Sequence, residues 1–408
     1  FFFFFFFFYC HSYPRPQIFG RGGGKMKARM TSWISSTSNC LTVFLLLLTQ
    51  NSGILADDGL LPNGDFEAAA AAGGVDVWEK RGEVEVVESG QRQGAMLLVV
   101  PHGRRAVKLG NDAEIRQVVR VEKGASYSLT FIAARTCAQS ESLNVSVPPG
   151  SQTIDLQTVY SVRGWDAYAA AFQAAADSVE ITLANPGMEE DPACGPILDD
   201  VAIKKLPAPD KPQEALVRNG RFENGPWLFR NYSLGVLLPT CFDEEESPLP
   251  GWNVESGKPV RFIDSDHYAV PEGKRAIELV SGKEGIISQM VPTRPGRTYS
   301  LMFRVGQAGD RCRPPLAVRA FAADQAETVH YTADANSSHQ AAALNFTARA
   351  ENTRIAFQSV YYNLRTDDHT SLCGPVVDDV QVQPSGSVLI GPIWLGFVIG
   401  IGLLGMIS

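Results

Sequence analysis

Two copies of one sequence pattern lie along this chain, and no other feature constrains its fold as strongly. LPNGDFE at 61–67 recurs as VRNGRFE at 217–223, and CGPILDDVAI at 194–203 recurs as CGPVVDDVQV at 373–382. Two shorter matches, AVKLG with AIELV and YSLTF with YSLMF, fall between them in the same order. Four matches in one order predict two similar domains in tandem.

The repeat also sets the domain boundaries that we expect. The first copy covers residues 57–206, and the second covers residues 214–384. Between them, residues 207–213 contain three prolines and form the predicted linker. Each copy has the length of an ordinary single domain.

Both copies carry the alternation of apolar and polar residues that is typical of β-strands with one buried face. YSLTF at 127–131 and VEITL at 179–183 show it in the first copy. Gly, Pro and Asn separate such runs at short spacing, which favours an all-β sandwich or jelly roll. The segment 167–176 has the alanine content of a helix, but its counterpart at 340–346 alternates, so we predict strands for both.

The N-terminal residues are not expected in the mature protein. Residues 1–25 begin with a run of phenylalanines and are interpreted as translated upstream sequence; an unusual targeting extension is the alternative. Residues 26–56 have the pattern of a signal peptide, with two basic residues, the short apolar run LTVFLLLL at 41–48 and a small residue before Asp57. The apolar run is too short to span a bilayer, which favours secretion over anchoring.

The C-terminal residues 385–408 form an uncharged hydrophobic tail. Its length suits either a membrane span or the removed part of a GPI signal. Ser385 begins a stretch of small residues and is the predicted attachment site of a GPI anchor. The polar spacer of a GPI signal is lacking, and so is the basic residue that usually follows a span. Both alternatives stay open, and each tethers the protein to the outer face of the plasma membrane.

The charge of the predicted mature chain excludes some classes of ligand. The whole sequence has 36 basic and 44 acidic side chains, and the five basic residues before Asp57 leave a net charge of −13 for the mature part. Such a surface repels nucleic acid, so we expect no nucleic-acid partner. Demethylated pectin is disfavoured for the same reason.

Cysteine usage fits an oxidising compartment and follows the repeat. Each copy has one cysteine after its YSL strand and one before its GP-DDV strand, so we predict the disulfides Cys137–Cys194 and Cys312–Cys373. Closing loops of this length would add about 4 kcal/mol each in the chain-entropy model. Cys241 lies in a segment without a counterpart and is either free or paired between chains.

Four N-glycosylation sequons lie behind the predicted signal peptide, which makes secretion and glycosylation mutually consistent. Their acceptor residues are Asn144, Asn231, Asn336 and Asn345.

These stretches together resemble a plant cell-wall family, that of domain of unknown function 642. DGLLPNGDFE, YSLTFIAARTCAQ, VRFIDSDHYAVPEGKRAIELV and SLCGPVVDDV carry the resemblance, which covers nearly all of 57–384. It implies tandem galactose-binding-like domains, location in the wall, and association with wall polysaccharides and pectin methylesterases. The hydrophobic tail places the chain among the membrane-anchored members. The alanine run at 68–72 and the acidic run at 243–246 depart from the family pattern.

No motif in the sequence predicts an enzyme. The chain has no G-x-S-x-G elbow, no H-E-x-x-H and no P-loop, and its histidines lack metal-ligand spacing. The aspartate pairs at 199–200 and 378–379 would have to face each other across a sugar to act as a glycosidase. Adjacent strand residues point to opposite faces, so we expect no catalysis from them.

The recurring acids favour a structural role instead. Modules with a similar arrangement often hold a calcium ion that joins their first and last strands, and calcium prefers oxygen ligands. Salt links or turn hydrogen bonds are an equally good interpretation. The candidate ligands are Glu67, Asp199 and Asp200 in the first copy, and Glu223, Asp378 and Asp379 in the second.

Exposed aromatic residues are the candidates for glycan binding, because their flat rings can stack on sugars. Trp165 and Tyr168 lie in a glycine-flanked polar stretch, and Tyr361 and Tyr362 precede a polar loop. The sequence therefore predicts a non-catalytic wall protein that binds a cellulose- or hemicellulose-type glycan. The alternative is an interaction scaffold that docks and modulates a wall enzyme such as pectin methylesterase.

Overall fold

The computed structural model describes most of the two repeats. The described ranges are 58–68, 75–93, 96–137, 139–187, 189–191, 193–207, 216–226, 234–244, 246–255, 257–332 and 339–385. The residues assigned to upstream sequence and signal peptide (1–56), nearly all of the linker and the tail beyond Ser385 lie outside these ranges. Within the described residues, no helix has the length and apolar character needed to cross a membrane.

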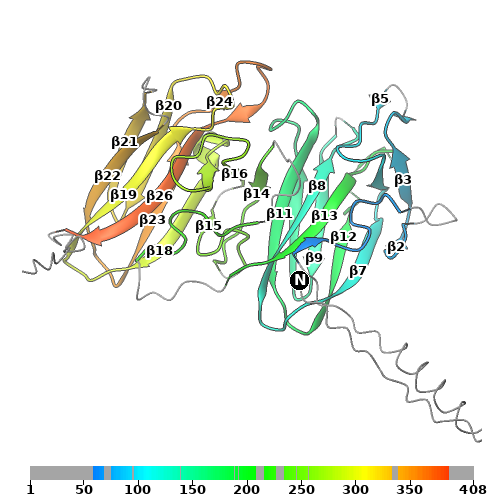
Figure 1. Cartoon of the computed structure of the whole chain (residues 1–408), viewed down its shortest axis with the longest axis horizontal. Helices are drawn as coiled ribbons and strands as arrows, with labels where there is room; N and C mark the ends of the chain where they lie inside the picture. The colour runs from blue at the N-terminus through cyan, green and yellow to red at the C-terminus, as the bar shows by residue number, and fades with distance from the viewer. Residues whose placement is uncertain are drawn as a thin grey trace, which may run out of the picture. The chain divides into compact units, whose positions relative to one another are not determined.

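The first copy forms a β-sandwich of two five-stranded sheets (Figure 1). One sheet has, in spatial order, β11 (Trp165–Gln173), β8 (Ser126–Ala134), β13 (Ile197–Lys205), β6 (Arg105–Leu109) and β3 (Val84–Glu88), with β1 (Gly59–Leu60) also paired to β13. The other has β10 (Gly150–Leu156), β9 (Glu141–Val147), β12 (Ser178–Ala184), β7 (Glu114–Arg120) and β2 (Glu79–Arg81). A small hairpin, β4 (Arg92–Gln93) and β5 (Met96–Leu97), lies outside both sheets.

The second copy repeats the order of the five main strands in each sheet (Figure 1). Its first sheet has β22 (His339–Thr347), β19 (Thr298–Gln307), β26 (Pro375–Pro384), β17 (Arg275–Glu278) and β16 (Val260–Asp264). Its second has β21 (Gln325–Tyr331), β20 (Leu316–Ala322), β23 (Asn352–Ser359), β18 (Ile286–Pro292) and β15 (Asn253–Val254). The hairpin β24 (Asn363–Leu364) and β25 (Leu372–Cys373) and one 3-10 turn, Gly282–Glu284, complete it. No α-helix occurs among the described residues, so the predicted all-β fold with two tandem sandwiches is confirmed.

The alanine-rich segment that has the composition of a helix is a strand, as predicted. It forms most of β11, which pairs with β8 along its whole length, Trp165 opposite Ala134 and Gln173 opposite Ser126. Its counterpart is β22, which pairs with β19 in the same way. Tertiary pairing therefore overrides the helix propensity of alanine here.

The repeated motifs build the same core contacts in both copies. The phenylalanine of the NGxFE motif packs on a tryptophan, with ring centroids 5.8 Å apart for Phe66–Trp78 and 5.2 Å for Phe222–Trp252. Each tryptophan donates its indole N–H to the backbone carbonyl of the motif's asparagine, at 3.1 and 3.2 Å. The phenylalanine of the NGxFE motif and the backbone of its asparagine are therefore part of the core in both copies.

Both predicted disulfides are confirmed. Cys137 bonds to Cys194 and Cys312 bonds to Cys373. Cys241 is a free, half-buried thiol.

A short strand that only the second copy possesses joins the two sandwiches. Strand β14 (Val236–Leu238) pairs in parallel with β11 at Tyr168 and antiparallel with β16. It thereby joins the first sheet of each copy into one 12-stranded sheet. Its side chains alternate between two apolar clusters, as strand geometry requires. Leu237 packs in the core of the first sandwich, and Val236 and Leu238 pack in a cluster that contains residues of both sandwiches.

A buried ion pair lies beside this junction. Arg261 Nη1 on β16 donates a hydrogen bond of 2.9 Å to Glu278 Oε2 on β17, and both side chains are buried. The same guanidinium donates from Nη2 to the backbone carbonyl of Tyr160 in the first copy, at 3.1 Å. Burial raises the pKa of Asp166 on β11 to about 7, and the positive charge of Arg261 opposes that shift. Arg261 thus links the two copies through charge and hydrogen bonds.

Replacement of Arg261 tests this link. Arg261→Ala leaves the Glu278 carboxylate buried without its partner, so we expect the free energy of unfolding in urea to fall by about 3–5 kcal/mol. The matched control is Arg349→Ala, which removes an exposed ion pair with Asp324 in the same sandwich and should cost less than about 1 kcal/mol. Equal losses for the two variants would contradict a structural role for the buried pair.

Candidate functional site

Tyr362 offers an exposed and rigidly held aromatic ring. The side chain is 54% exposed, and its hydroxyl donates a hydrogen bond of 2.9 Å to Glu284 Oε2. The ring lies against Gly282, where a Cβ atom would come within 2.7 Å of two ring carbons. Gly282 also has a φ of +55°, which favours glycine. These contacts fix the ring while leaving it open to solvent, as stacking on a sugar requires.

Tyr361, the neighbouring candidate, is half-buried and therefore less exposed than Tyr362. Its ring centroid lies 6.3 Å from that of His330, and its backbone carbonyl accepts a hydrogen bond from Ser359 Oγ. Tyr361 therefore presents less of its own surface than Tyr362 does.

The prediction of exposed sugar platforms at Trp165 and Tyr168 is wrong, because both rings are buried, at 6% and 2% exposure. Trp165 begins strand β11 and clusters with Leu98 and Val100, and its indole N–H donates to the carbonyl of Val99. Tyr168 packs in the first core, 6.0 Å from Phe131. The flanking glycine suggested an exposed position for Trp165, but residues 98–100, distant in the sequence, cover its ring.

The recurring acids of the first copy do come together. Glu67 Oε1 accepts hydrogen bonds from the backbone N–H groups of Arg104 and Arg105, at 2.6 and 2.8 Å. Asp200 contacts the His102 ring, and its N–H donates to Asp199 Oδ1. Burial, followed by the charge of Asp200, raises the pKa of Asp199 to about 9.

The two aspartates interact because the strand is irregular where they lie. The pairing of β13 with β8 shifts register between Asp199 and Ala202, and Asp200 has a φ of +48°. A β-bulge of this kind breaks the alternation of side chains that the sequence led us to expect. Asp199 Oδ2 is buried and makes no hydrogen bond of good geometry among the described residues, although the backbone of His102 lies close enough to lower the pKa of this carboxyl. Carboxylate oxygens are the donors that a hard cation prefers, but the ligand atoms of Glu67, Asp199 and Asp200 do not all lie within 4.8 Å of one another.

The second copy arranges the same acids differently. Glu223 again accepts a backbone N–H, from Lys274 at 2.7 Å. Asp378 uses both oxygens, accepting from Asp379 N and Glu272 N, and burial raises its pKa to about 7. Asp379 forms ion pairs with two arginines. Its Oδ2 lies 3.2 Å from Arg304 Nε, and its Oδ1 lies 3.5 Å from Arg221 Nε. Arginine cations thus occupy the surroundings of this cluster, which fits a metal ion poorly.

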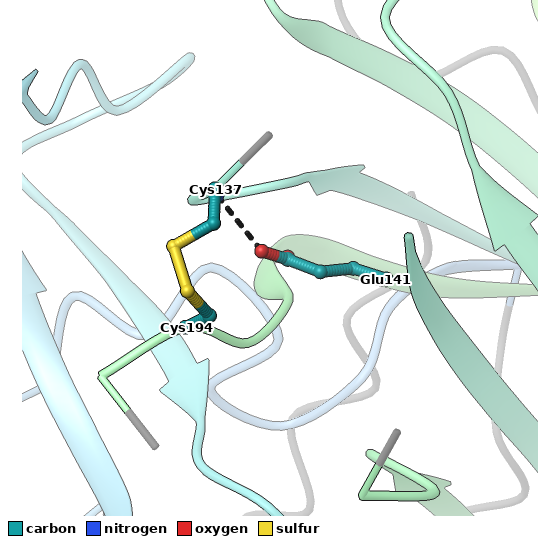
Figure 2. Close-up of side chains that lie close together, drawn as sticks. All are labelled: Cys137, Glu141 and Cys194. Carbon is teal, nitrogen blue, oxygen red and sulfur yellow. Dashed lines mark hydrogen bonds between the residues drawn. A yellow bond between two sulfur atoms is a disulfide. The ribbon is translucent and has the colours of Figure 1, made fainter. Parts of the chain in front are cut away.

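Glu141 supports the first disulfide and is a residue that sequence reasoning missed. Figure 2 shows its carboxylate beside the Cys137–Cys194 bridge, where Oε1 accepts the N–H of Cys137 at 2.8 Å. It also accepts from the N–H and hydroxyl of Thr136. Burial raises the pKa of Glu141, and these hydrogen bonds oppose the shift. Because both sulfurs are bonded to each other, the group lacks the thiolates that a zinc site uses.

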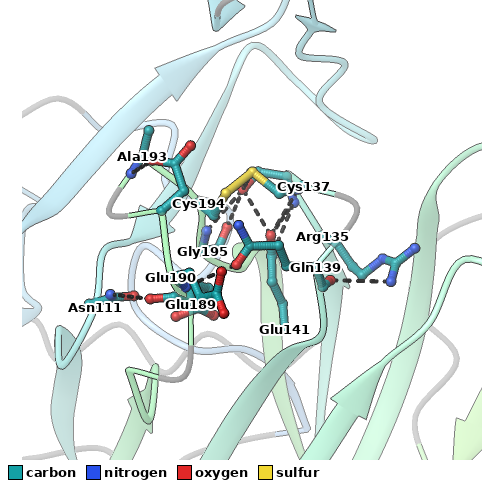
Figure 3. The surroundings of a disulfide bond; sticks show 12 residues. Asn111, Arg135, Cys137, Gln139, Glu141, Glu189, Glu190, Ala193, Cys194 and Gly195 are labelled. Carbon is teal, nitrogen blue, oxygen red and sulfur yellow. Dashed lines mark hydrogen bonds between the residues drawn. A yellow bond between two sulfur atoms is a disulfide. The ribbon is translucent and has the colours of Figure 1, made fainter.

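A network of backbone and side-chain hydrogen bonds extends from this disulfide (Figure 3). Gln139 Oε1 accepts the N–H of Glu190, and Asn111 Nδ2 donates to the carbonyl of Glu189, both at 2.9 Å. The bridge and Glu141 therefore hold together loops from distant parts of the first copy. Strand β9 starts with Glu141, whereas its counterpart β20 starts with Leu316. This difference between the two copies is the sequence signal that could have identified Glu141.

The sequons remain predictions. Asn345 is exposed on β22, and Asn144 on β9 is half-buried, with its amide donating to Ser151 and Thr153. Asn231 and Asn336 lie outside the described residues. Ser385, the predicted anchor site, donates its N–H to the carbonyl of Thr298, and the residues after it are not described.

Comparison with known proteins identifies the family. A family model described as "Protein of unknown function (DUF642)" matches residues 59–204 and 215–383. The chain belongs to the DUF642 family. The resemblance expected from the sequence is confirmed at this level.

Two DUF642 relatives come from Arabidopsis thaliana. The protein DUF642 L-galactono-1,4-lactone-responsive gene 2 is 48% identical over 336 residues, covering 80% of this chain and 91% of its own. Protein TEEBE is 42% identical over 365 residues, covering 85% and 99%. Among solved structures, the CBM22-1-CBM22-2 tandem domain of Paenibacillus barcinonensis Xyn10C is 14% identical, covering 82% of this chain and 100% of its own, with a TM-score of 0.26. That score is too low to support a conclusion about fold or function.

The role of Glu141 in this DUF642 chain can be tested by Glu141→Gln. Gln can keep its carbonyl oxygen at the position of Oε1, but its NH2 group then faces the Thr136 N–H that Oε2 accepts, and the hydrogen bonds to Oε1 lose their charge assistance, so we expect the free energy of unfolding to fall by about 1–3 kcal/mol. Non-reducing peptide mapping should still find Cys137 bonded to Cys194. Glu327→Gln, an exposed change on β21, is the control and should stay within about 0.5 kcal/mol of the parent. A Glu141→Gln protein as stable as the control would remove the anchoring role.

Proposed function

We propose that this chain is a secreted, non-catalytic protein of the plant cell wall that binds a neutral polysaccharide of the cellulose or hemicellulose type. The observation that carries the proposal is Tyr362, the one of the four aromatic candidates whose ring is both well exposed and fixed in place. A neutral glycan suits the net charge of −13 on the predicted mature part better than polygalacturonate does. The hydrophobic tail would tether the protein to the outer face of the plasma membrane.

The physics of one aromatic platform suits weak, reversible binding. Stacking a sugar on the Tyr362 ring removes apolar area from water, at roughly 25 cal/mol per Å². The hydrogen bond to Glu284 and the contact with Gly282 order the ring before the sugar arrives. Less conformational entropy is therefore lost on binding.

The positions of the recurring acids support a non-catalytic role. A glycosidase needs two carboxylates that flank a bond in an open site. Here Asp199 and Asp378 are fully buried, and Glu67 and Glu223 accept backbone N–H groups. An exposed aromatic ring can also anchor a protein partner, so a scaffold for a wall enzyme such as pectin methylesterase is the alternative.

Substitution of Tyr362 tests the proposal. Tyr362→Ala should weaken binding to insoluble cellulose or xyloglucan by about 1–2 kcal/mol, roughly five- to thirtyfold, because the stacking surface is lost. Tyr362→Phe keeps the ring and should keep most of the affinity. Met290→Ala, which truncates an exposed apolar side chain elsewhere in the second sandwich, should have no effect. A depletion isotherm on the insoluble polymer measures all three.

Two results would overturn this function. Release of reducing sugar from any of the polymers would make the protein an enzyme. If the parent protein is not retained on any wall polymer, the scaffold alternative replaces glycan binding.

A structural calcium ion in the first sandwich is a separate part of the proposal. Asp199 supplies a buried carboxylate oxygen that makes no hydrogen bond of good geometry among the described residues, and the charges of Asp200 and Glu67 act on this carboxyl. These are hard oxygen donors of the kind that calcium prefers. In the second sandwich the arginines beside Asp379 provide positive charge, so we propose no ion there.

Chelation tests the calcium proposal without reference to glycan binding. An ion at about 100 times its Kd stabilises the folded state by about 2.7 kcal/mol, or roughly 5–10 °C in a protein of this size. We expect the melting temperature of calcium-loaded protein to fall by that amount in chelator. Asp199→Asn should abolish the response, and the matched Asp378→Asn should retain it. Equal melting temperatures with calcium and with chelator would refute the site.

A further inference from the structure

A cavity of about 270 Å³ lies between the first sandwich and a segment that only the second copy possesses. Its floor includes Leu129, Val145 and Phe172, which belong to the apolar core of the first sandwich. Its rim is formed by the segment around Cys241, part of the acidic insertion. Gln152 Nε2 donates to the carbonyl of Thr240 at 2.6 Å and fastens this segment to β10.

The rim of the cavity is acidic. Asp243 and Glu246 are both exposed and line it, and no lysine, arginine or histidine is among the described residues that do. Glu246 reaches across to the first copy, where its Oε2 lies 3.9 Å from the position of a Cβ on Gly150. No ion pair of Glu246 is found among the described residues. Burial raises the pKa of the Cys241 thiol, the hydrogen bond with the Asp243 backbone lowers it, and the charges of Asp243 and Glu246 add to the rise.

One of the residues that line the cavity, Phe242, is an exposed aromatic residue. Phe242 is 72% exposed, although it borders a cavity with an apolar floor. The arrangement therefore combines an apolar base, a negative rim and an adjoining apolar surface.

We propose that this cavity binds an arginine or lysine side chain from a basic segment of a partner protein. The aliphatic stem would lie on the floor, and the cationic head would face Glu246, as long basic side chains commonly do. The volume is below the roughly 300–1,000 Å³ of ordinary small-molecule pockets, which suits one side chain better than a polysaccharide segment. Phe242 would contact the backbone beside that side chain. The inference goes beyond glycan binding and does not depend on it.

A pair of labelled peptides tests the proposal on the full-length protein. Fluorescein-labelled Gly-Gly-Arg-Gly-Gly should bind by anisotropy, and the same peptide with neutral citrulline should bind more weakly. Higher salt should weaken only the arginine peptide, because exposed charges are screened. Glu246→Gln should weaken the arginine peptide about two- to fivefold, the range of a partly exposed ion pair. Glu351→Gln, an exposed acid elsewhere in the second sandwich, should leave it unchanged.

Two further variants keep the outcome decisive. Ala171→Trp places a ring in the cavity and should abolish binding. Tyr362→Ala should leave peptide binding intact, so that failure of this site and failure of glycan binding can be told apart. Equal binding of the arginine and citrulline peptides would overturn the proposal. An unchanged affinity of Glu246→Gln for the arginine peptide would do so as well.

Discussion

Strand β14 is the element on which the two-sandwich structure depends. Without it, β11 and β16 would be edge strands, each with a row of unpaired backbone N–H and C=O groups. Its three residues pair with both strands, at Tyr168 of β11 and at Val260, Arg261 and Phe262 of β16, and turn two sheets into one. Because the side chains of β14 alternate, Leu237 extends the first core while Val236 and Leu238 extend the second cluster. The two copies are consequently joined through packing and backbone pairing, and the proline-containing linker is not their only connection.

The charges at this junction show how the two copies have diverged. Lys108 on β6 lies opposite Glu85 on β3, and at the corresponding positions Glu278 on β17 lies opposite Arg261 on β16. The acidic and basic residues have exchanged strands between the two copies. Both partners are buried only in the second pair, Arg261 and Glu278. A buried ion pair repays its desolvation only when its remaining polar groups are satisfied. Arg261 meets part of this requirement by bonding to the Tyr160 carbonyl, which also fixes how the two copies meet.

The features that could be predicted from the sequence are those that it records twice. The two-domain β architecture and the disulfides follow from local patterns present in both copies. The burial of Trp165 depends on residues 98–100, far away in sequence, and no local pattern reports such a contact. The interaction of Asp199 with Asp200 depends on a bulge, which breaks the alternation from which the prediction was argued. Strand β14 lies in a segment without a counterpart, so the repeat gave no guide to it.

A comparison of the two copies separates structural from functional residues. The Phe–Trp pairs occur in both sandwiches, as do Tyr127 and Tyr299, whose hydroxyls each accept a backbone N–H at 2.9 Å. Such contacts are needed wherever this sandwich folds, so their repetition reports stability. Tyr362 and the acidic cavity rim each occur once: the first copy has no aromatic residue between β12 and β13, at 185–196, and no counterpart of the segment 240–246. A residue that the fold does not require in one copy is free to serve recognition in the other, and this is why the proposed binding surfaces lie where the repeat fails.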